Sequence, residues 1–197
     1  MVPEGASDGT VRLDVVGSVA VITLDRPSKL NAFVGDMREQ LISRLDEIGA
    51  HDDVRVLVLT GAGQAFCAGG DLAFMVDLHQ RRAGFDCVEP LVAAGAAVVT
   101  RLTAFPFPVL AAVNGVAAGA GANLALACDV RLASDAARFS QSFVRLALHP
   151  DWGGSYTLPR AVGLANALDL CWTGDMIDAA EALRLGLVQR LWPAAAF

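Results

Sequence analysis

The stretch FPVLAAVNGVAAGAGANLALA, residues 107–127, decides the fold of this chain. It reads as a short apolar strand, a turn at Asn114-Gly115, a second short extended piece and a helix that begins at glycines. The same order precedes it in VRVLVLTGAGQAFCAGGDL, residues 54–72, and follows it more weakly in CDVRLASDAARFSQSFVRLAL, residues 128–148. The spacing of the copies is uneven, but their shared order predicts stacked strand–strand–helix units wound around one core.

The segments on either side of these units predict further elements. Two apolar runs joined at Gly17-Ser18, residues 11–16 and 19–24, indicate a β-hairpin. Apolar runs and helical periodicity predict a strand buried on both faces at residues 54–59 and helices at residues 36–48, 156–162, 165–173 and 179–185. The sequence stops at LWPAAAF, which we expect to be an apolar end with nothing to pack against.

The composition excludes several classes of protein. Of the 197 residues, 54% are apolar and 18% are charged, a balance that excludes a disordered chain. The net charge is -6 and the sequence has no basic run, so we expect no nucleic-acid partner and no binding to an anionic membrane. Residues 102–128 carry no charge, but their prolines, glycines and asparagines interrupt any spanning helix.

The cysteines predict a reducing compartment. None has the CxxC spacing of a metal or redox pair, and in a chain this apolar they are typical of buried thiols. The N-terminal residues MVPEGASDGT lack the apolar segment of a signal peptide. We therefore expect a cytoplasmic protein without a metal site. The four cysteines are Cys67, Cys87, Cys128 and Cys171.

The two glycine-rich segments suggest a site built from backbone groups. Neither contains the Gly-Lys-Ser/Thr of a phosphate-binding P-loop, and Gly119-Ala-Gly121 does not complete GxGxxG. Small residues before a helix let a ligand approach the backbone, and the first helical N–H groups are free to donate. Two such turns facing one cleft would hold one oxygen between two donors. Close packing of strand against helix explains the same residues equally simply.

Four motifs in collinear order resemble the enoyl-CoA hydratase/isomerase (crotonase) superfamily. They are ITLDRPSKLNAF, LTGAGQAFCAGGDL, AAVNGVAAGAGANLALACDVRLAS and LPRAVG, within residues 11–191. The resemblance implies an α/β fold, a crotonase-like superhelix of ββα units. It would cover residues 11–197 after a flexible N-terminus at residues 1–10, without the family's final C-terminal helices. More narrowly, GVAAGAGANLALACDVRLA, FVRLALHPDWGGS and LPRAVG resemble 1,2-epoxyphenylacetyl-CoA isomerases.

The resemblance implies roles for backbone groups. The N–H groups of Gly70 and Ala120 match the family's oxyanion hole, which holds the thioester oxygen of an acyl-CoA. Coenzyme A arrives as part of the substrate, so no separate cofactor is implied. Arg26 and Lys29 are candidates to contact the CoA phosphates. The remaining candidates to line the CoA channel are Ala68, Gly69, Asp71 and Leu72.

The acid and base of the family's hydratases are missing here. Hydratases of the family carry two glutamates at positions where this chain has Asn123 and Phe143. Adding water needs one group to activate it and one to deliver a proton, and these side chains do neither. Both remain candidates to contact substrate, although Asn123 would equally suit a helix cap.

Asp151, in HPDWGGS, is the substitute carboxylate that the resemblance implies. One carboxylate suffices for an isomerase, since it takes a proton from one carbon and returns it to another. The expected reaction is double-bond migration in an enoyl-CoA or ring-opening isomerisation of an epoxyphenylacetyl-CoA. Alternatives are a hydratase with a non-standard acid/base pair, a dehalogenase-type enzyme with Asp151 as nucleophile, and a non-catalytic acyl-CoA-binding protein. A turn or helix-capping Asp would look the same in sequence. With the C-terminal helices present, the resemblance implies a homotrimer or a dimer of trimers.

Overall fold

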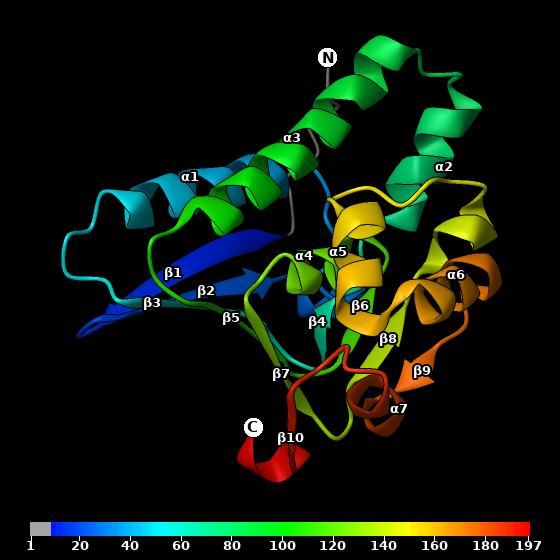
Figure 1. The fold of residues 1–197 in the computed structure, drawn as a ribbon. Helices are drawn as coiled ribbons and strands as arrows, with labels where there is room; N and C mark the ends of the chain where they lie inside the picture. The colour runs from blue at the N-terminus through cyan, green and yellow to red at the C-terminus, as the bar shows by residue number, and fades with distance from the viewer. Residues whose placement is uncertain (1–8) are drawn as a thin grey trace.

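The computed structural model describes residues 9–197, whose strands form two β-sheets (Figure 1). In the larger sheet the order of the six strands is β1 (Thr10–Val16), β2 (Val19–Asp25), β3 (Val56–Gly61), β5 (Val109–Val113), β7 (Val130–Ser134) and β10 (Arg190–Trp192). In the smaller sheet the order is β4 (Ala65–Cys67), β6 (Val116–Ala118), β8 (Arg138–Ser140) and β9 (Ile177–Asp178). Only the β1–β2 and β8–β9 pairs are antiparallel.

Each predicted unit contributes one strand to each sheet. The first strands of the units, β3, β5 and β7, are parallel neighbours in the larger sheet, and the second strands, β4, β6 and β8, are parallel neighbours in the smaller one. The predicted stacking is therefore confirmed. Because β4 and β6 are parallel and adjacent, the glycine-rich segments that follow them leave the sheet side by side.

Helices cover the sheets and connect the strands. In chain order they are α1 (Met37–Gly49), α2 (Leu72–Gln80), α3 (Phe85–Ala104), α4 (Ala120–Leu126), α5 (Gly154–Val162), α6 (Leu164–Thr173) and α7 (Ala179–Arg184). Short 3-10 helices are η1 (Pro27–Lys29), η2 (Ser142–Leu146) and η3 (Ala194–Ala196). Helix α3, green in Figure 1, crosses the molecule against α1, while α4 lies at its centre.

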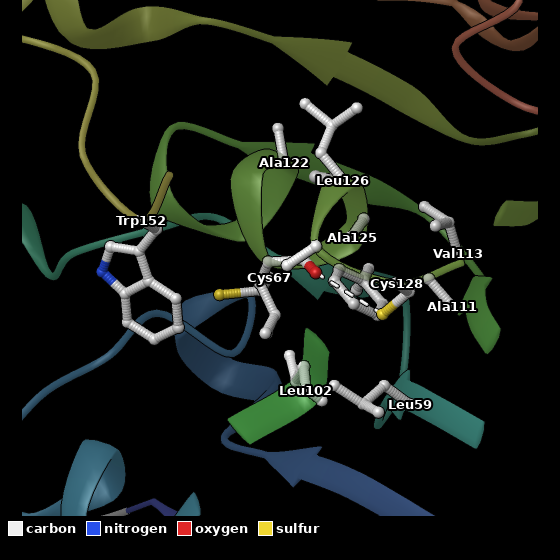
Figure 2. Close-up of a cluster of buried hydrophobic side chains, with 14 of the residues drawn as sticks. Leu59, Cys67, Leu102, Ala111, Val113, Ala122, Ala125, Leu126, Cys128 and Trp152 are labelled. Atoms are coloured by element: carbon white, nitrogen blue, oxygen red, sulfur yellow. Dashed lines mark hydrogen bonds between the residues drawn. The ribbon is translucent and has the colours of Figure 1, made fainter. Parts of the chain in front are cut away.

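Helix α4 is entirely buried because its residues are small or aliphatic. All seven of its residues are buried, which no helix at a protein surface allows. Figure 2 shows Ala122, Ala125 and Leu126 in one cluster with Leu59 and Leu102, and with Trp152 at its edge. The core therefore surrounds the segment that the sequence identified as decisive.

The structure corrects several predictions about elements. The 20-residue helix α3 was missed, although Ala94, Gly95, Val98 and Leu102 form a buried stripe along its second half. The strand at residues 56–61 alternates buried and half-buried residues, so only one of its faces is fully covered. Within the predicted unpacked end, Leu191 and Trp192 do pack, because β10 pairs in parallel with β7, whereas residues 193–197 are exposed. Of the predicted flexible segment 1–10, residues 1–8 lie outside the described residues, and Thr10 already belongs to β1.

One helix has the length and hydropathy of a membrane span, although not where the uncharged stretch suggested. Residues 102–128 divide among the end of α3, β5, β6 and α4. Helix α3 itself qualifies by length and composition, with 22% of its most apolar window buried in this chain. Core and interface helices meet the same criteria, so this feature decides nothing about a membrane.

Candidate active site

The first glycine loop (residues 68–71) joins β4 to α2 and is held against residues 30–33. Ala68 N donates to Leu30 O at 2.9 Å, Phe33 N donates to Gly69 O at 2.7 Å, and Asp71 N donates to Phe33 O at 3.0 Å. Gly69 has a φ of +91°, which favours glycine. Among residues 9–197, Gly70 N donates to no acceptor. The loop is thus fixed on both sides of a free amide.

Asp71 ends this loop in a structural role. Its Oδ1 accepts from Phe74 N at 3.1 Å, which caps α2, and its Oδ2 accepts from Arg26 Nη1 at 2.6 Å. Burial alone would raise the pKa of this carboxyl, but the bonds from Arg26 and Phe74 outweigh that effect and lower it. The prediction that Arg26 contacts CoA phosphates is wrong in this structure, because its guanidinium is buried in the pair with Asp71.

The second glycine loop (residues 118–121) leads into α4 and touches the first. Gly119 has a φ of +51° and donates its N–H to Ser140 O at 2.9 Å. A Cβ added to Gly69 would lie 2.8 Å from Ala118 O and 3.3 Å from Ala120 N, so only glycine permits this approach. Ala120 N, at the first position of α4, also donates to no acceptor within the described chain. Each of the two contacting loops therefore leaves one amide unbonded.

Asp151 lies in a tight turn before α5. The next two residues, Trp152 and Gly153, have φ values of +49° and +71°, so the turn is left-handed at both. Its carboxylate is half-buried, and Oδ1 has no hydrogen-bond partner in the part of the chain that the structure describes. Burial raises the pKa of this carboxyl, and a backbone hydrogen bond, Arg38 and His149 oppose the rise. The predicted alternative of a helix cap is not what the structure shows, because Gly153 is the N-cap of α5 and no side chain caps it.

Asn123 fixes the turn that carries Asp151. Its Nδ2 donates to Asp151 O at 2.8 Å, and its Oδ1 accepts from Gln141 Nε2 at 3.0 Å. Asn123 is fully buried, and a Cβ added to Gly154 would overlap its side chain. The alternative that Asn123 caps its helix is wrong, because Asn123 lies inside α4 and Gly119 is the N-cap. Its contact with substrate stays a prediction, and in this structure both of its polar groups bond to protein atoms. Through Asn123, the Asp151 turn is tied to the helix that begins at Ala120.

An aromatic stack ties the same turn to the first glycine loop. The Trp152 ring stacks on the Phe33 ring with centroids 4.8 Å apart, and Phe33 is the residue whose backbone bonds to Gly69 and Asp71. Trp152 is 4% exposed, and its indole packs on Gly95 of α3. The Arg38 guanidinium lies over the other partner of the stack, 5.4 Å from the Phe33 centroid. Both glycine loops are thus connected to Asp151.

The other predicted site residues lie around this centre. Lys29 is exposed at the end of η1, in the segment that holds the first glycine loop, and Ala68 is half-buried. Leu72 is 58% exposed at the start of α2. Phe143 is 7% exposed, with its ring 3.7 Å from where a Cβ on Gly119 would lie, so it packs beneath the second loop. No cluster of His, Cys, Asp and Glu within residues 9–197 has the geometry of a metal site.

Known proteins share this arrangement of elements. A family model described as enoyl-CoA hydratase/isomerase matches residues 14–197. This chain belongs to the enoyl-CoA hydratase/isomerase family. The short-chain-enoyl-CoA hydratase of Clostridium acetobutylicum is 40% identical over 92% of this chain and 68% of its own length. The 1,2-epoxyphenylacetyl-CoA isomerase of Escherichia coli is 41% identical over 86% of this chain and 64% of its own length.

Solved structures of the family agree with the fold. An enoyl-CoA hydratase from Polaromonas sp. JS666 superposes with a TM-score of 0.88 at 34% identity, over 94% of this chain and 72% of that one. An enoyl-CoA hydratase/isomerase from Cupriavidus metallidurans gives 0.86 at 38% identity, over 95% and 69%. The crotonase-like fold is therefore confirmed. This chain spans about two thirds of the length of the curated relatives it matches.

Two residues of this family member's site were missed by sequence reasoning. Arg38 is buried although it is charged, and the spacing of Arg38, Leu41 and Leu45 along α1 already placed it on the inner face of the helix. Gln141, which holds Asn123, gave no such signal, because it lies in an irregular segment before η2.

Proposed function

We propose that this protein is an acyl-CoA isomerase in which Gly70 N and Ala120 N hold the thioester oxygen and Asp151 moves the proton. The observation that carries the proposal is the connection of three unsatisfied groups: two amides in touching loops, and a carboxylate oxygen on a turn bonded to α4 and stacked on Phe33. Two amide donors at one oxygen match the charge that develops when C2 loses its proton.

The proposed steps balance with one carboxylate. The C2–H bond breaks, its proton forms an O–H bond on Asp151, and the electron pair of the broken bond moves onto the thioester oxygen. The carboxylic acid then returns the proton at another carbon. A carboxylate with a raised pKa holds the proton more strongly between these steps, which suits a shuttle. We propose that CoA lies along Lys29 and the backbone of Ala68–Leu72, that no further cofactor takes part, and that the protein works in the cytoplasm.

The second candidate is a hydratase, which the names of several relatives favour. Against it, neither Asn123 nor Phe143 has a carboxyl group, and the buried Asn123 amide already donates to Asp151 O. A hydratase would therefore need a second acid or base from elsewhere in the whole protein. Homotrimer formation and a role in phenylacetate or fatty-acid breakdown are proposals of the same kind, from the resemblance.

The test is proton exchange at C2 in heavy water. We would offer 3-enoyl-, 2-enoyl- and arylacetyl-CoA thioesters to the wild type, to Asp151→Asn and to Asp169→Asn, the same change on the exposed face of α6. We expect isomerisation and exchange with the wild type and Asp169→Asn, and a loss on the order of 100- to 10,000-fold with Asp151→Asn.

Each other outcome supports a different candidate. Exchange that survives in Asp151→Asn would remove this carboxylate from the mechanism. Hydration of a 2-enoyl-CoA at ordinary rates would establish the hydratase, and a trapped acyl-aspartate would establish the dehalogenase-type reaction. Affinity for the thioesters without any turnover would leave a binding protein.

A further inference from the structure

Arg38 is a buried cation without a hydrogen-bond partner. It lies on the inner face of α1 and is 7% exposed, and neither Nε nor Nη1 finds an acceptor among the described residues. The other two buried arginines of residues 9–197 make side-chain hydrogen bonds: Arg26 Nη1 pairs with Asp71 at 2.6 Å, although its Nε has no partner, and Arg131 donates to Leu187 O and Cys128 O, both at 2.7 Å. Buried charges are ordinarily paired, so an unpaired one points to a function.

The guanidinium lies against the proposed oxyanion site. Nη2 is 3.9 Å from where a Cβ on Gly70 would lie, next to the amide assigned to the thioester oxygen. Its central carbon lies over the Phe33 ring, which stacks on Trp152. The positive charge therefore lies beside the first glycine loop and over the Phe33 ring, which stacks on Trp152 of the Asp151 turn.

Arg38 does not form an ion pair with Asp151. Across residues 9–197, the ion pairs closer than 4.0 Å do not include these two residues, yet their charges interact. Burial lowers the pKa of Arg38, while Glu39, Cys67 and Asp151 oppose this, and a guanidinium stays charged in proteins. Asp151 interacts in addition with His149 of its own loop. A close pair would favour the ionised carboxylate more strongly than this longer-range interaction does.

We propose that Arg38 is a positioning residue whose fixed cation favours the reaction, because it stabilises the negative charge that passes from Asp151 to the thioester oxygen at Gly70. This inference rests on the proposed function. When the C2 proton moves to Asp151, the carboxylate becomes neutral and the thioester oxygen becomes an enolate. A fixed cation beside Gly70 stabilises the negative charge that the thioester oxygen gains in the transition state. In the resting protein the same charge opposes the rise that burial causes in the pKa of Asp151.

The experiment compares two arginines of the same helix. Arg38→Met keeps the length and packing of the side chain but removes its charge, and Arg38→Lys restores a charge. Arg44→Met removes a half-buried charge from α1 that pairs with Glu47. The first measurement is the titration of the Asp151 carboxyl by ¹³C NMR in the free protein, assigned by its absence in Asp151→Asn. The second is the pH profile of C2 exchange with kcat and KM measured separately.

We expect Arg38→Met to raise the titration midpoint of Asp151 and to move the acid limb of the rate profile to higher pH. We expect kcat to fall on the order of 10- to 100-fold with KM nearly unchanged, because the lost interaction belongs to the transition state. Arg38→Lys should recover part of both effects, and Arg44→Met should match the wild type.

Two results would overturn the inference in distinguishable ways. If the wild type isomerises its substrate and Arg38→Met shows the wild-type midpoint and kcat, the inference fails while the proposed function stands. If the wild type exchanges no C2 proton with any thioester, the proposed function fails and takes the inference with it. If Arg38→Met does not fold, the comparison of Arg38→Lys with Arg44→Met tests the inference. The lysine places its charge at a different point from the guanidinium, so Arg38→Lys should shift the titration midpoint of Asp151, whereas Arg44→Met should not.

Discussion

Replacing Asn123 by Asp tests whether this amide holds the Asp151 turn. The substitution keeps the shape of the side chain but exchanges the Nδ2 donor for an oxygen. That oxygen would face Asp151 O, which the amide now contacts at 2.8 Å. An ionised carboxylate at a fully buried position, opposite a carbonyl oxygen, is an uncompensated buried charge. We expect a loss of about 3–5 kcal/mol in the free energy of unfolding at neutral pH.

The sign of the pH dependence follows from the protonated form. Once protonated, the new carboxyl can donate to Asp151 O and accept from Gln141, so the folded state favours the proton and raises the pKa of the group. Below about pH 3.9 both states are protonated and the penalty is small. As pH rises above that value, only the unfolded state ionises freely, and the penalty grows until the folded group ionises too.

The assay is urea unfolding between about pH 4 and about pH 8, with Asn166→Asp as the control. Asn166 is exposed on α6 and its Nδ2 donates to Val162 O at 2.7 Å, so the same change removes an amide donor where water can solvate the new carboxylate, and it should cost about 0.5–1.5 kcal/mol. C2 exchange per folded molecule should fall in Asn123→Asp alone. A stability difference that is absent, or that does not change with pH, would refute the assignment of the amide as the donor to Asp151.

Three further predictions use other parts of the site. Asp71→Asn breaks the buried pair with Arg26 and should lower the free energy of unfolding by about 3–5 kcal/mol at neutral pH. Because the pKa of Asp71 is lowered in the folded wild type, this difference should shrink as acid protonates that carboxyl, and urea unfolding at several pH values measures it. Gly95→Ala places a Cβ 2.7 Å from Trp152 Cδ1, so it should cost about 1–3 kcal/mol and change the Trp emission, and unchanged values would contradict the packing. A thiol reagent on the folded protein at mildly alkaline pH should modify exposed Cys87 before buried Cys67, because burial raises the pKa of the Cys67 thiol to about 12; peptide mass mapping reads the order.

The order of the units was predictable, because glycine placement and β-branched runs are local signals. Residues 54–72 and 107–127 each formed the expected strand, short strand and helix. The pairing of β10 with β7 was not predictable, since it joins Arg190 to Leu132 across the chain and its three residues carry no strand pattern of their own. Long-range pairing depends on the space that the rest of the fold leaves open.

The site divides in the same way. The small residues predicted two glycine-rich turns, the family resemblance pointed to the amides of Gly70 and Ala120 within them, and the structure brings the two loops into contact. The true partner of Asn123 was not found, since its contact with Asp151 spans 28 positions and no periodicity relates them. Arg38 could have been predicted, because helical spacing places this charged residue on the buried face of α1, and a buried charge is ordinarily paired or functional.

The position of Asn123 bears on which reactions one site can perform. The resemblance to family hydratases places a glutamate there, yet in this chain the position supplies the amide that fixes the Asp151 turn to α4. An ionised acid cannot donate to the Asp151 carbonyl, and a longer side chain would meet the backbone of Gly154, where even a Cβ finds no room. A glutamate that serves hydration and an amide that holds the Asp151 turn therefore cannot both occupy position 123. A chain with the Asn123 amide bonded to Asp151 O therefore has no glutamate at this position. We expect Asn123→Glu to lower the free energy of unfolding without producing hydratase activity.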